Sequence, residues 1–195
     1  MPFLPAVAVA FGVVFLAEFG DKSQLLILAF ATRYPWRPVV IGLVLAAAVI
    51  QGISVGVGAV VGAALPETAV GVVAGLAFLA VALWTLRGDD DDEPEAADGK
   101  PGVAGLALVA AVAGTFILAE LGDKTMLATF ALAASQGPIP TWIGSTLGEV
   151  AANLVAVAIG HHVGTRLSPR AIRIGSSFLF AAAGIAVLLG ALAGR

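Results

Sequence analysis

A ten-residue stretch occurs twice in the sequence, as AEFGDKSQLL from Ala17 to Leu26 and as AELGDKTMLA from Ala119 to Ala128. Each copy places a glutamate, an aspartate and a lysine in the middle of a long apolar segment. Ionisable groups are costly inside a membrane and mark ion or substrate pathways there. The two copies therefore predict a functional site in a membrane setting.

The composition indicates an integral membrane protein. Of the 195 residues, 59% are hydrophobic and 12% are charged, and the mean hydropathy is +1.02. Soluble domains are only about 45–50% apolar and could not cover so much apolar surface. The net charge of −3, with no basic patch, argues against nucleic acid as a partner. The chain has no cysteine, which excludes disulfides and thiolate metal sites.

Six segments are long and apolar enough to cross a bilayer, which takes about 20 residues. They are Phe3–Ala31, Val39–Ala63, Ala69–Leu86, Val103–Ala134, Thr141–Val163 and Ile172–Ala193. The first is expected to be a transmembrane helix and not a cleaved signal peptide, because no basic residues precede it. The first and fourth exceed the required length, which suits helices that are tilted or interrupted at the motif.

The two halves of the chain are repeats related by a shift of 102 positions. The same shift, without a gap, aligns Glu18 with Glu120, Asp21 with Asp123, Lys22 with Lys124, Gly42 with Gly144 and Gln51 with Asn153. Three spans per half is an odd number, so the second half must enter the membrane the other way up. The predicted fold class is an all-α integral membrane protein with six transmembrane helices, arranged as two inverted-topology three-helix repeats.

The repeats set the predicted domain boundaries and the orientation. The first repeat covers residues 1–87, an acidic linker covers 88–101, and the second repeat covers 102–195. Nearly all basic residues outside the motifs fall on one side of the membrane, namely Arg33, Arg37, Arg87, Lys100, Arg166, Arg170 and Arg173. The positive-inside rule makes that side cytoplasmic, together with the linker, and places both termini outside.

The candidate site consists of the acids in the two motifs. Residues three apart share a face of a regular helix, so Glu18 is expected to point with Asp21, and Glu120 with Asp123. Inverted repeats would bring these four carboxylates together at the bilayer centre. Auxiliary ligands or proton-coupling groups are expected nearby: Ser23, Thr125, Gln51, Asn153, Lys22, Lys124 and Glu149.

An all-oxygen cluster suits hard divalent cations such as Mg²⁺, Ca²⁺ or Mn²⁺. The glycines before the two aspartates loosen the helix, and a broken helix could offer main-chain carbonyls as further ligands. Four carboxylates in a low-dielectric site repel one another, so some should hold protons when no metal is bound. A divalent ion that displaces these protons, and is expelled when they return, gives cation/proton exchange.

The two lysines and Glu149 each allow more than one role. Each lysine either pairs with an acid on a neighbouring helix or swings into the emptied site to balance its charge. Glu149 aligns with Ala47 and so breaks the repeat symmetry. It lies one turn before Asn153 and could relay protons, act as an asymmetric ligand, or stay protonated in a polar cavity.

The alternatives are export of another substrate, a purely structural role and a protease. The same acids could export a small cationic organic substrate such as a basic amino acid. They could also form a salt-bridge network that only fixes helix packing, although buried ion pairs add little stability. An intramembrane aspartyl protease is disfavoured, because the position two before each Gly-Asp holds Glu18 or Glu120 where that class needs glycine. Tyr34 is also the only tyrosine, so no Tyr-Asp motif exists.

The duplicated E-x-G-D-K-[ST] pattern resembles the Gdt-type cation/proton antiporters of the lysine-exporter superfamily, which include Golgi members and bacterial manganese exporters. The resemblance covers nearly the whole chain and includes the acidic linker. It implies a transporter and not an enzyme, with Ca²⁺/Mn²⁺:H⁺ exchange at Glu18, Asp21, Glu120 and Asp123. Asparagine is usual in the family on both the second and fifth helices, so Gln51 departs from the pattern.

The compact bacterial members suggest Mn²⁺ export across a bacterial plasma membrane, with Ca²⁺ as the next cation. No resident cofactor is expected, because the cation is the substrate. The expected partners are membrane lipid, the divalent cation and protons. The oligomeric state is left open, a homodimer included.

Overall fold

The computed structural model describes residues 1–19, 21–87, 104–163 and 169–193, and these residues form α-helices joined by short connections. The helices are α1 (Phe3–Glu18), α2 (Lys22–Arg33), α3 (Trp36–Ala64), α4 (Glu67–Arg87), α5 (Leu106–Glu120), α6 (Lys124–Gln136), α7 (Pro138–Val163) and α8 (Pro169–Leu192). No strand occurs in these ranges. The all-α prediction is therefore confirmed for the described part of the chain.

Two of the predicted spans are each divided into two helices. The first span is α1 followed by α2, and the fourth is α5 followed by α6. By length and composition, α3 and the segment Thr68–Arg87 of α4 can each cross a membrane alone. The α5–α6 pair qualifies only as a single span that bends by 80° at its break. In the described residues, two helices thus meet the criterion outright, and the bent pair makes a third.

A tight turn causes the break between α5 and α6. Leu121 has φ −63° and ψ 116°, Gly122 has φ +85°, and the Asp123 amide donates to the Glu120 carbonyl at 3.2 Å. These are the angles and the hydrogen bond of a type II turn, whose third residue needs positive φ and is therefore usually glycine. The E-x-G-D motif thus encodes the turn as well as the acids.

The first motif folds in the same way wherever it is described. Phe19 has φ −67° and ψ 117°, close to the angles of Leu121, and the Asp21 amide donates to the Glu18 carbonyl at 3.1 Å. Glu18 and Asp21 are therefore separated by a turn and do not lie on one face of a regular helix, although each offers a carboxylate oxygen within 4.8 Å of the other. Each helix ends at its glutamate, and each aspartate stands on the far side of a turn.

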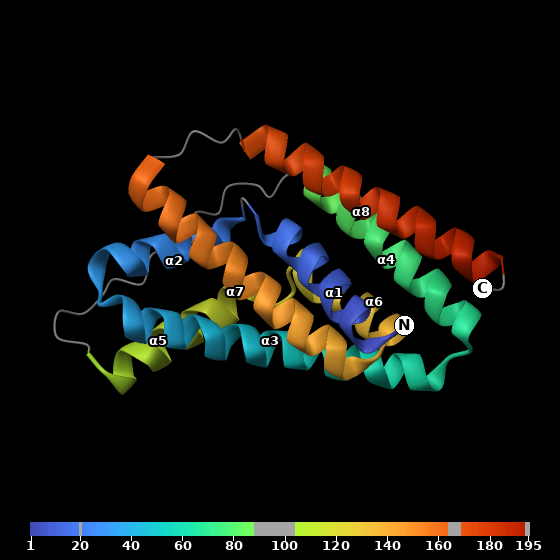
Figure 1. Ribbon diagram of the computed structural model, residues 1–195, viewed down its shortest axis with the longest axis horizontal. Coiled ribbons are helices and arrows are strands. Elements are labelled where there is room, and N and C mark those ends of the chain that lie inside the picture. The colour runs from blue at the N-terminus through green and yellow to red at the C-terminus, as the bar shows by residue number, and fades with distance from the viewer. Residues whose placement is uncertain (20, 88–103, 164–168, 194–195) are drawn as a thin grey trace.

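Helices from the two sequence halves pack on one another. Helix α1 lies along α7, α3 lies along α5 and then α6, and α4 pairs with α8. Figure 1 shows that α3 and α7 run in opposite directions, as do α4 and α8. Helices that are equivalent under the shift of 102 positions therefore point opposite ways.

Two equivalent glycines make equivalent contacts. A Cβ atom on Gly42 of α3 would lie 2.7 Å from Val112 Cβ of α5, and one on Gly144 of α7 would lie 2.8 Å from Ala10 Cβ of α1. Both the glycines and their neighbours are 102 positions apart. Only glycine permits such close helix approach. The internal repeat is thus visible in packing as well as in sequence.

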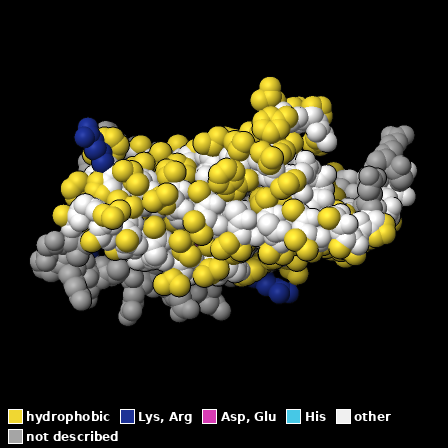
Figure 2. Space-filling view, turned by 90° about the horizontal axis from the view of Figure 1, so that it is seen from below, with side chains coloured by type: hydrophobic (Ala, Val, Ile, Leu, Met, Phe, Trp, Pro, Cys, Tyr) yellow, Lys and Arg dark blue, Asp and Glu magenta, His cyan; other side chains and the backbone are white. Residues whose placement is uncertain are grey.

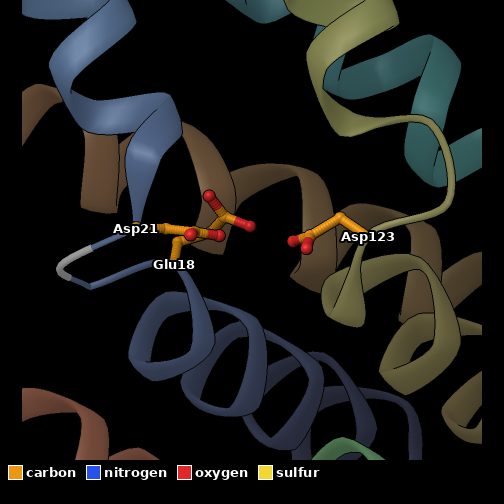
Figure 3. Close-up of side chains that lie close together, drawn as sticks. All are labelled: Glu18, Asp21 and Asp123. Carbon is orange, nitrogen blue, oxygen red and sulfur yellow. The ribbon is translucent and has the colours of Figure 1, made fainter. Parts of the chain in front are cut away.

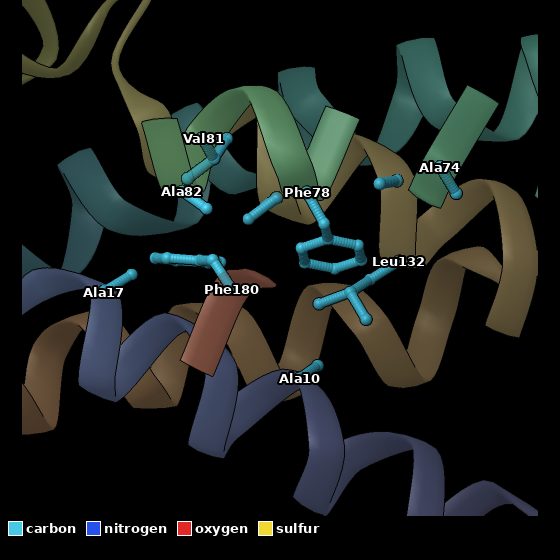
Figure 4. Close-up of a cluster of buried hydrophobic side chains, with 10 residues drawn as sticks. Ala10, Ala17, Ala74, Phe78, Val81, Ala82, Leu132 and Phe180 are labelled. Carbon is cyan, nitrogen blue, oxygen red and sulfur yellow. The ribbon is translucent and has the colours of Figure 1, made fainter. Parts of the chain in front are cut away.

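The distribution of side chains fits a membrane setting, with polar groups inside and apolar groups outside. Phe78 and Phe180 stack with ring centroids 6.2 Å apart at the centre of an apolar cluster (Figure 4). Large apolar side chains such as Leu106, Leu118 and Phe178 are more than 70% exposed. The face shown in Figure 2 is mostly hydrophobic, with basic groups at its outline and no acidic group among its coloured atoms.

Candidate metal centre at the two helix breaks

Three acidic side chains from both halves meet where the helices break. Glu18 ends α1, Asp21 precedes α2 and Asp123 precedes α6, and each offers a carboxylate oxygen within 4.8 Å of the other two. All three are less than 10% exposed. In Figure 3, Asp123 points toward Glu18 and Asp21 from the opposite side of the site. We call these three residues the carboxylate trio.

Glu120, the fourth predicted ligand, is not a member of this trio. It ends α5 as Glu18 ends α1, and it is 2% exposed. It interacts electrostatically with Glu18, Glu149, Asp123 and Asp21, and the Ser23 hydroxyl that donates to Glu18 also contacts it. All four predicted acids are therefore buried, and three of them offer oxygens within 4.8 Å of one another. The convergence of all four on one cation stays a prediction.

Lys124, the first residue of α6, crosses from one half to the other. Its Nζ lies 3.1 Å from Asp21 Oδ1, with both side chains at most 10% exposed. Of the two interpretations of this lysine, the structure shows the ion pair with an acid on another element. The side chain of Lys22 lies outside the described residues.

The two motif hydroxyls both contact acids. Ser23 Oγ donates to Glu18 Oε2 at 3.0 Å, and it also interacts with Glu120 of the other half. Thr125 Oγ1 lies 3.5 Å from Asp123 Oδ2, a long hydrogen bond. Ser23 thus links the two glutamates, whereas Thr125 stays beside its own aspartate.

The predicted auxiliary groups of the long helices lie next to one another. Gln51 of α3 and Glu149 of α7 are fully buried, and Gln51 Nε2 donates a short hydrogen bond to Glu149 Oε2. Asn153 is also fully buried, and its Nδ2 donates to the Glu149 backbone carbonyl at 3.0 Å. These contacts leave the amide oxygens of Gln51 and Asn153 without a donor in the described part of the chain.

Two further polar residues were not singled out from the sequence. Gln24 Nε2 donates to the carbonyl of Ala152 on α7 at 3.3 Å, which ties the first motif to the helix that carries Asn153. Thr129 lies one turn after Thr125 and is fully buried. The signal for Thr129 was its spacing of four from a motif hydroxyl within an apolar span.

Each break brings helix ends of opposite polarity to the site. Helices α1 and α5 end at a motif glutamate with partial negative charge, and α2 and α6 begin directly after a motif aspartate with partial positive charge. The carbonyls of Glu18 and Glu120 accept the turn hydrogen bonds. The side-chain oxygens of the motif acids remain as metal ligands, and oxygen ligands suit a hard divalent cation.

Comparison with known proteins supports a transport role. The family profile described as "Divalent cation/proton antiporter GDT1" matches residues 6–93 and 108–195. Both the starts and the ends of these segments differ by 102 positions, since 108 minus 6 and 195 minus 93 give the same shift. No solved structure matches the chain.

Relatives from bacteria and plants agree with the family profile. A Vibrio cholerae protein named "Putative manganese exporter" is 33% identical over 80% of this chain and 77% of its own length. The Synechocystis GDT1-like protein sll0615 is 29% identical over 85% of this chain and 87% of its own length. The rice chloroplastic GDT1-like protein 1 is 35% identical over 51% of this chain and 31% of its own length. With its matched profile, its apolar helices and its buried acids, the chain belongs to the GDT1 family of divalent cation/proton antiporters, which are integral membrane transporters.

Proposed function

We propose that this protein exports a divalent cation, Mn²⁺ first and Ca²⁺ next, in exchange for protons. The observation that carries the proposal is the carboxylate trio, in which both halves of the chain contribute buried oxygens to one small volume. Glu18, Asp21 and Asp123 would hold the cation, and Glu120 would complete the site from the opposite helix end. The Vibrio relative, named as a manganese exporter, supports the choice of Mn²⁺.

We further propose that the chain spans a bacterial plasma membrane six times, as two inverted repeats covering residues 1–87 and 102–195. The acidic linker 88–101 would be cytoplasmic and both termini outside. The matched glycine contacts and the opposite directions of α3 and α7 support the inversion. In this arrangement the two turns lie at mid-membrane, where each broken span would hold its acids.

The exchange would follow from competition for the same oxygens. With the cation bound, the trio is ionised and its mutual repulsion is relieved. Protons arriving from the other side of the membrane neutralise the carboxylates and weaken the hold on the cation. Lys124 forms an ion pair with Asp21 in this structure, and it would have to move away for Asp21 to act as a ligand.

Reconstituted liposomes would test the proposal. Uptake of Mn²⁺, Ca²⁺ and Mg²⁺ is measured in parallel, with and without an imposed pH gradient, for the wild type and Asp123→Asn. We expect Mn²⁺ flux that follows the pH gradient and is lost in the variant. Thr115→Val is the control, because this hydroxyl donates only to the Ala111 carbonyl of its own helix.

Two results would contradict this function. One is Mn²⁺ flux that ignores the pH gradient or persists in Asp123→Asn. The other is inhibition of the flux by lysine or arginine with no effect of competing Ca²⁺, which would favour export of a basic amino acid.

A further inference from the structure

Two residues that break the repeat symmetry touch each other. Gln51 of α3 aligns with Asn153 of α7, whereas Glu149 of α7 aligns with Ala47 of α3. Gln51 and Glu149 are fully buried and joined by a hydrogen bond between the two long helices. The amide of Gln51 reaches this acid from the opposite half, and no equivalent acid exists at position 47.

The orientation of the amide groups leaves oxygens available for a ligand. Gln51 donates from its NH₂ group to Glu149, so its side-chain oxygen faces away from that bond. Asn153 uses its NH₂ group on the Glu149 backbone carbonyl. The buried oxygens that accept no hydrogen bond from the described part of the chain include Gln51 Oε1, Glu149 Oε1, Asn153 Oδ1 and Glu120 Oε2.

Unsatisfied buried oxygens need a partner. A buried polar group left without a partner loses its hydration with nothing to replace it, which destabilises the fold. Glu120 is not one of the three acids within 4.8 Å of one another, and it interacts electrostatically with Glu149 as well as with members of the trio. Glu120, Glu149 and the two amide oxygens therefore add ligand oxygens beside the trio.

The formal charge leaves room for more than one cation. The described buried side chains include five acids and one lysine, which sum to −4 when all are ionised. One divalent cation would leave −2, to be balanced by protons on the acids or by a second cation. Two divalent cations would bring the sum to zero. The acids are Glu18, Asp21, Glu120, Asp123 and Glu149, and the lysine is Lys124.

We propose a second cation subsite, formed by Glu149 with the side-chain oxygens of Gln51 and Asn153, and by Glu120, whose carboxylate would bridge it to the first site. This inference rests on the proposed function, because it adds a position to the same cation pathway. The set of ligands contains only oxygen and carries two negative charges when ionised, which fits one hard divalent cation. The trio, by contrast, is partly neutralised by Lys124 in the same structure.

The number of Mn²⁺ ions bound per chain tests the subsite independently of transport. Purified protein is equilibrated with Mn²⁺, and bound metal is counted by equilibrium dialysis and by electron paramagnetic resonance. We expect two ions in the wild type, whose close spacing broadens the resonance. We expect one ion and a narrow signal in Glu149→Gln, and the same in Gln51→Leu. The two variants lie on different helices, so that the subsite is still tested if one of them misfolds.

Ser54→Ala is the matched control, because Ser54 is buried one turn after Gln51 and donates to the Ile50 carbonyl of its own helix. It should keep two ions. A single ion in the wild type would overturn the subsite while leaving the proposed function intact. Two ions retained in both Glu149→Gln and Gln51→Leu would do the same. No bound Mn²⁺ in any protein would contradict the proposed function as well.

Discussion

Lys124 and Asp21 form a buried ion pair that joins the start of α6 to the turn before α2, with Nζ 3.1 Å from Oδ1. The two residues belong to different copies of the motif. The pair therefore links the two halves at the point where both helices are interrupted.

Removing one partner of this pair should be costly. Lys124→Met leaves Asp21 buried without its cation, and breaking a buried pair in this way costs about 3–5 kcal/mol. The free energy of unfolding in detergent should fall by about that amount, as measured by denaturant titration. The double variant Lys124→Met with Asp21→Asn should regain most of the loss but not transport. Equal stability of Lys124→Met and the wild type would show that the pair contributes nothing to the fold.

Gly122 should be indispensable for the turn. Its φ of +85° is unfavourable for any residue with a Cβ, although nothing lies within 4 Å of that position. Gly122→Ala should therefore lose about 1 kcal/mol through backbone strain alone, together with Mn²⁺ binding, because Asp123 is displaced. Gly114→Ala is the control, since it lies inside α5 with equally open space. It should keep or slightly raise the melting temperature, as alanine favours a helix. Similar losses in both variants would refute the turn argument.

The two equivalent glycine contacts should be equally sensitive. Gly42→Ala and Gly144→Ala each force a Cβ against the neighbouring helix, and such overpacking typically costs about 1–3 kcal/mol. Thermal unfolding in detergent should show comparable losses for the two variants. Gly56→Ala, on α3 with nothing within 4 Å, should be tolerated. A large difference between the first two variants would count against symmetric packing.

Cation affinity should weaken as the pH falls. The trio binds a cation only in its ionised form, so protons compete for the same oxygens. Calorimetric titration with Mn²⁺ should give a dissociation constant that rises on acidification, with proton release on binding that scales with buffer ionisation enthalpy. Asp123→Asn, with one fewer titrating group, should show a shallower pH dependence. A dissociation constant independent of pH would exclude direct competition.

Much of the architecture could be predicted, because long apolar segments indicate the helices and a constant shift between the two halves indicates the repeat. The shift of 102 positions, read from Glu18 and Glu120, reappears in the contacts of Gly42 and Gly144. The polarity of the motif could also be predicted, since acids in an apolar span rarely lack a function.

The local geometry of the motif could not be predicted by helical periodicity. Glycine before Asp123 signals a loosened helix, but only the positive φ of Gly122 reveals a type II turn. The turn, and not a regular helical face, thus sets how each glutamate lies relative to its aspartate. The partner of Lys124 and the contact between Gln51 and Glu149 lie about a hundred positions away in the sequence, so they depend on tertiary packing.

The interlocked helices have a consequence for how such a chain could arise and fold. Because α1 packs on α7, α3 on α5 and α4 on α8, each half finds its main partners in the other half. A three-helix half on its own would leave its closest packing surfaces uncovered. An ancestor with a single copy would have needed a second molecule inserted upside down, and the fused gene would supply such a dual-topology pair in one polypeptide. Cutting the chain between residues 88 and 101 and expressing both pieces together should accordingly restore the assembly, whereas neither piece should persist alone.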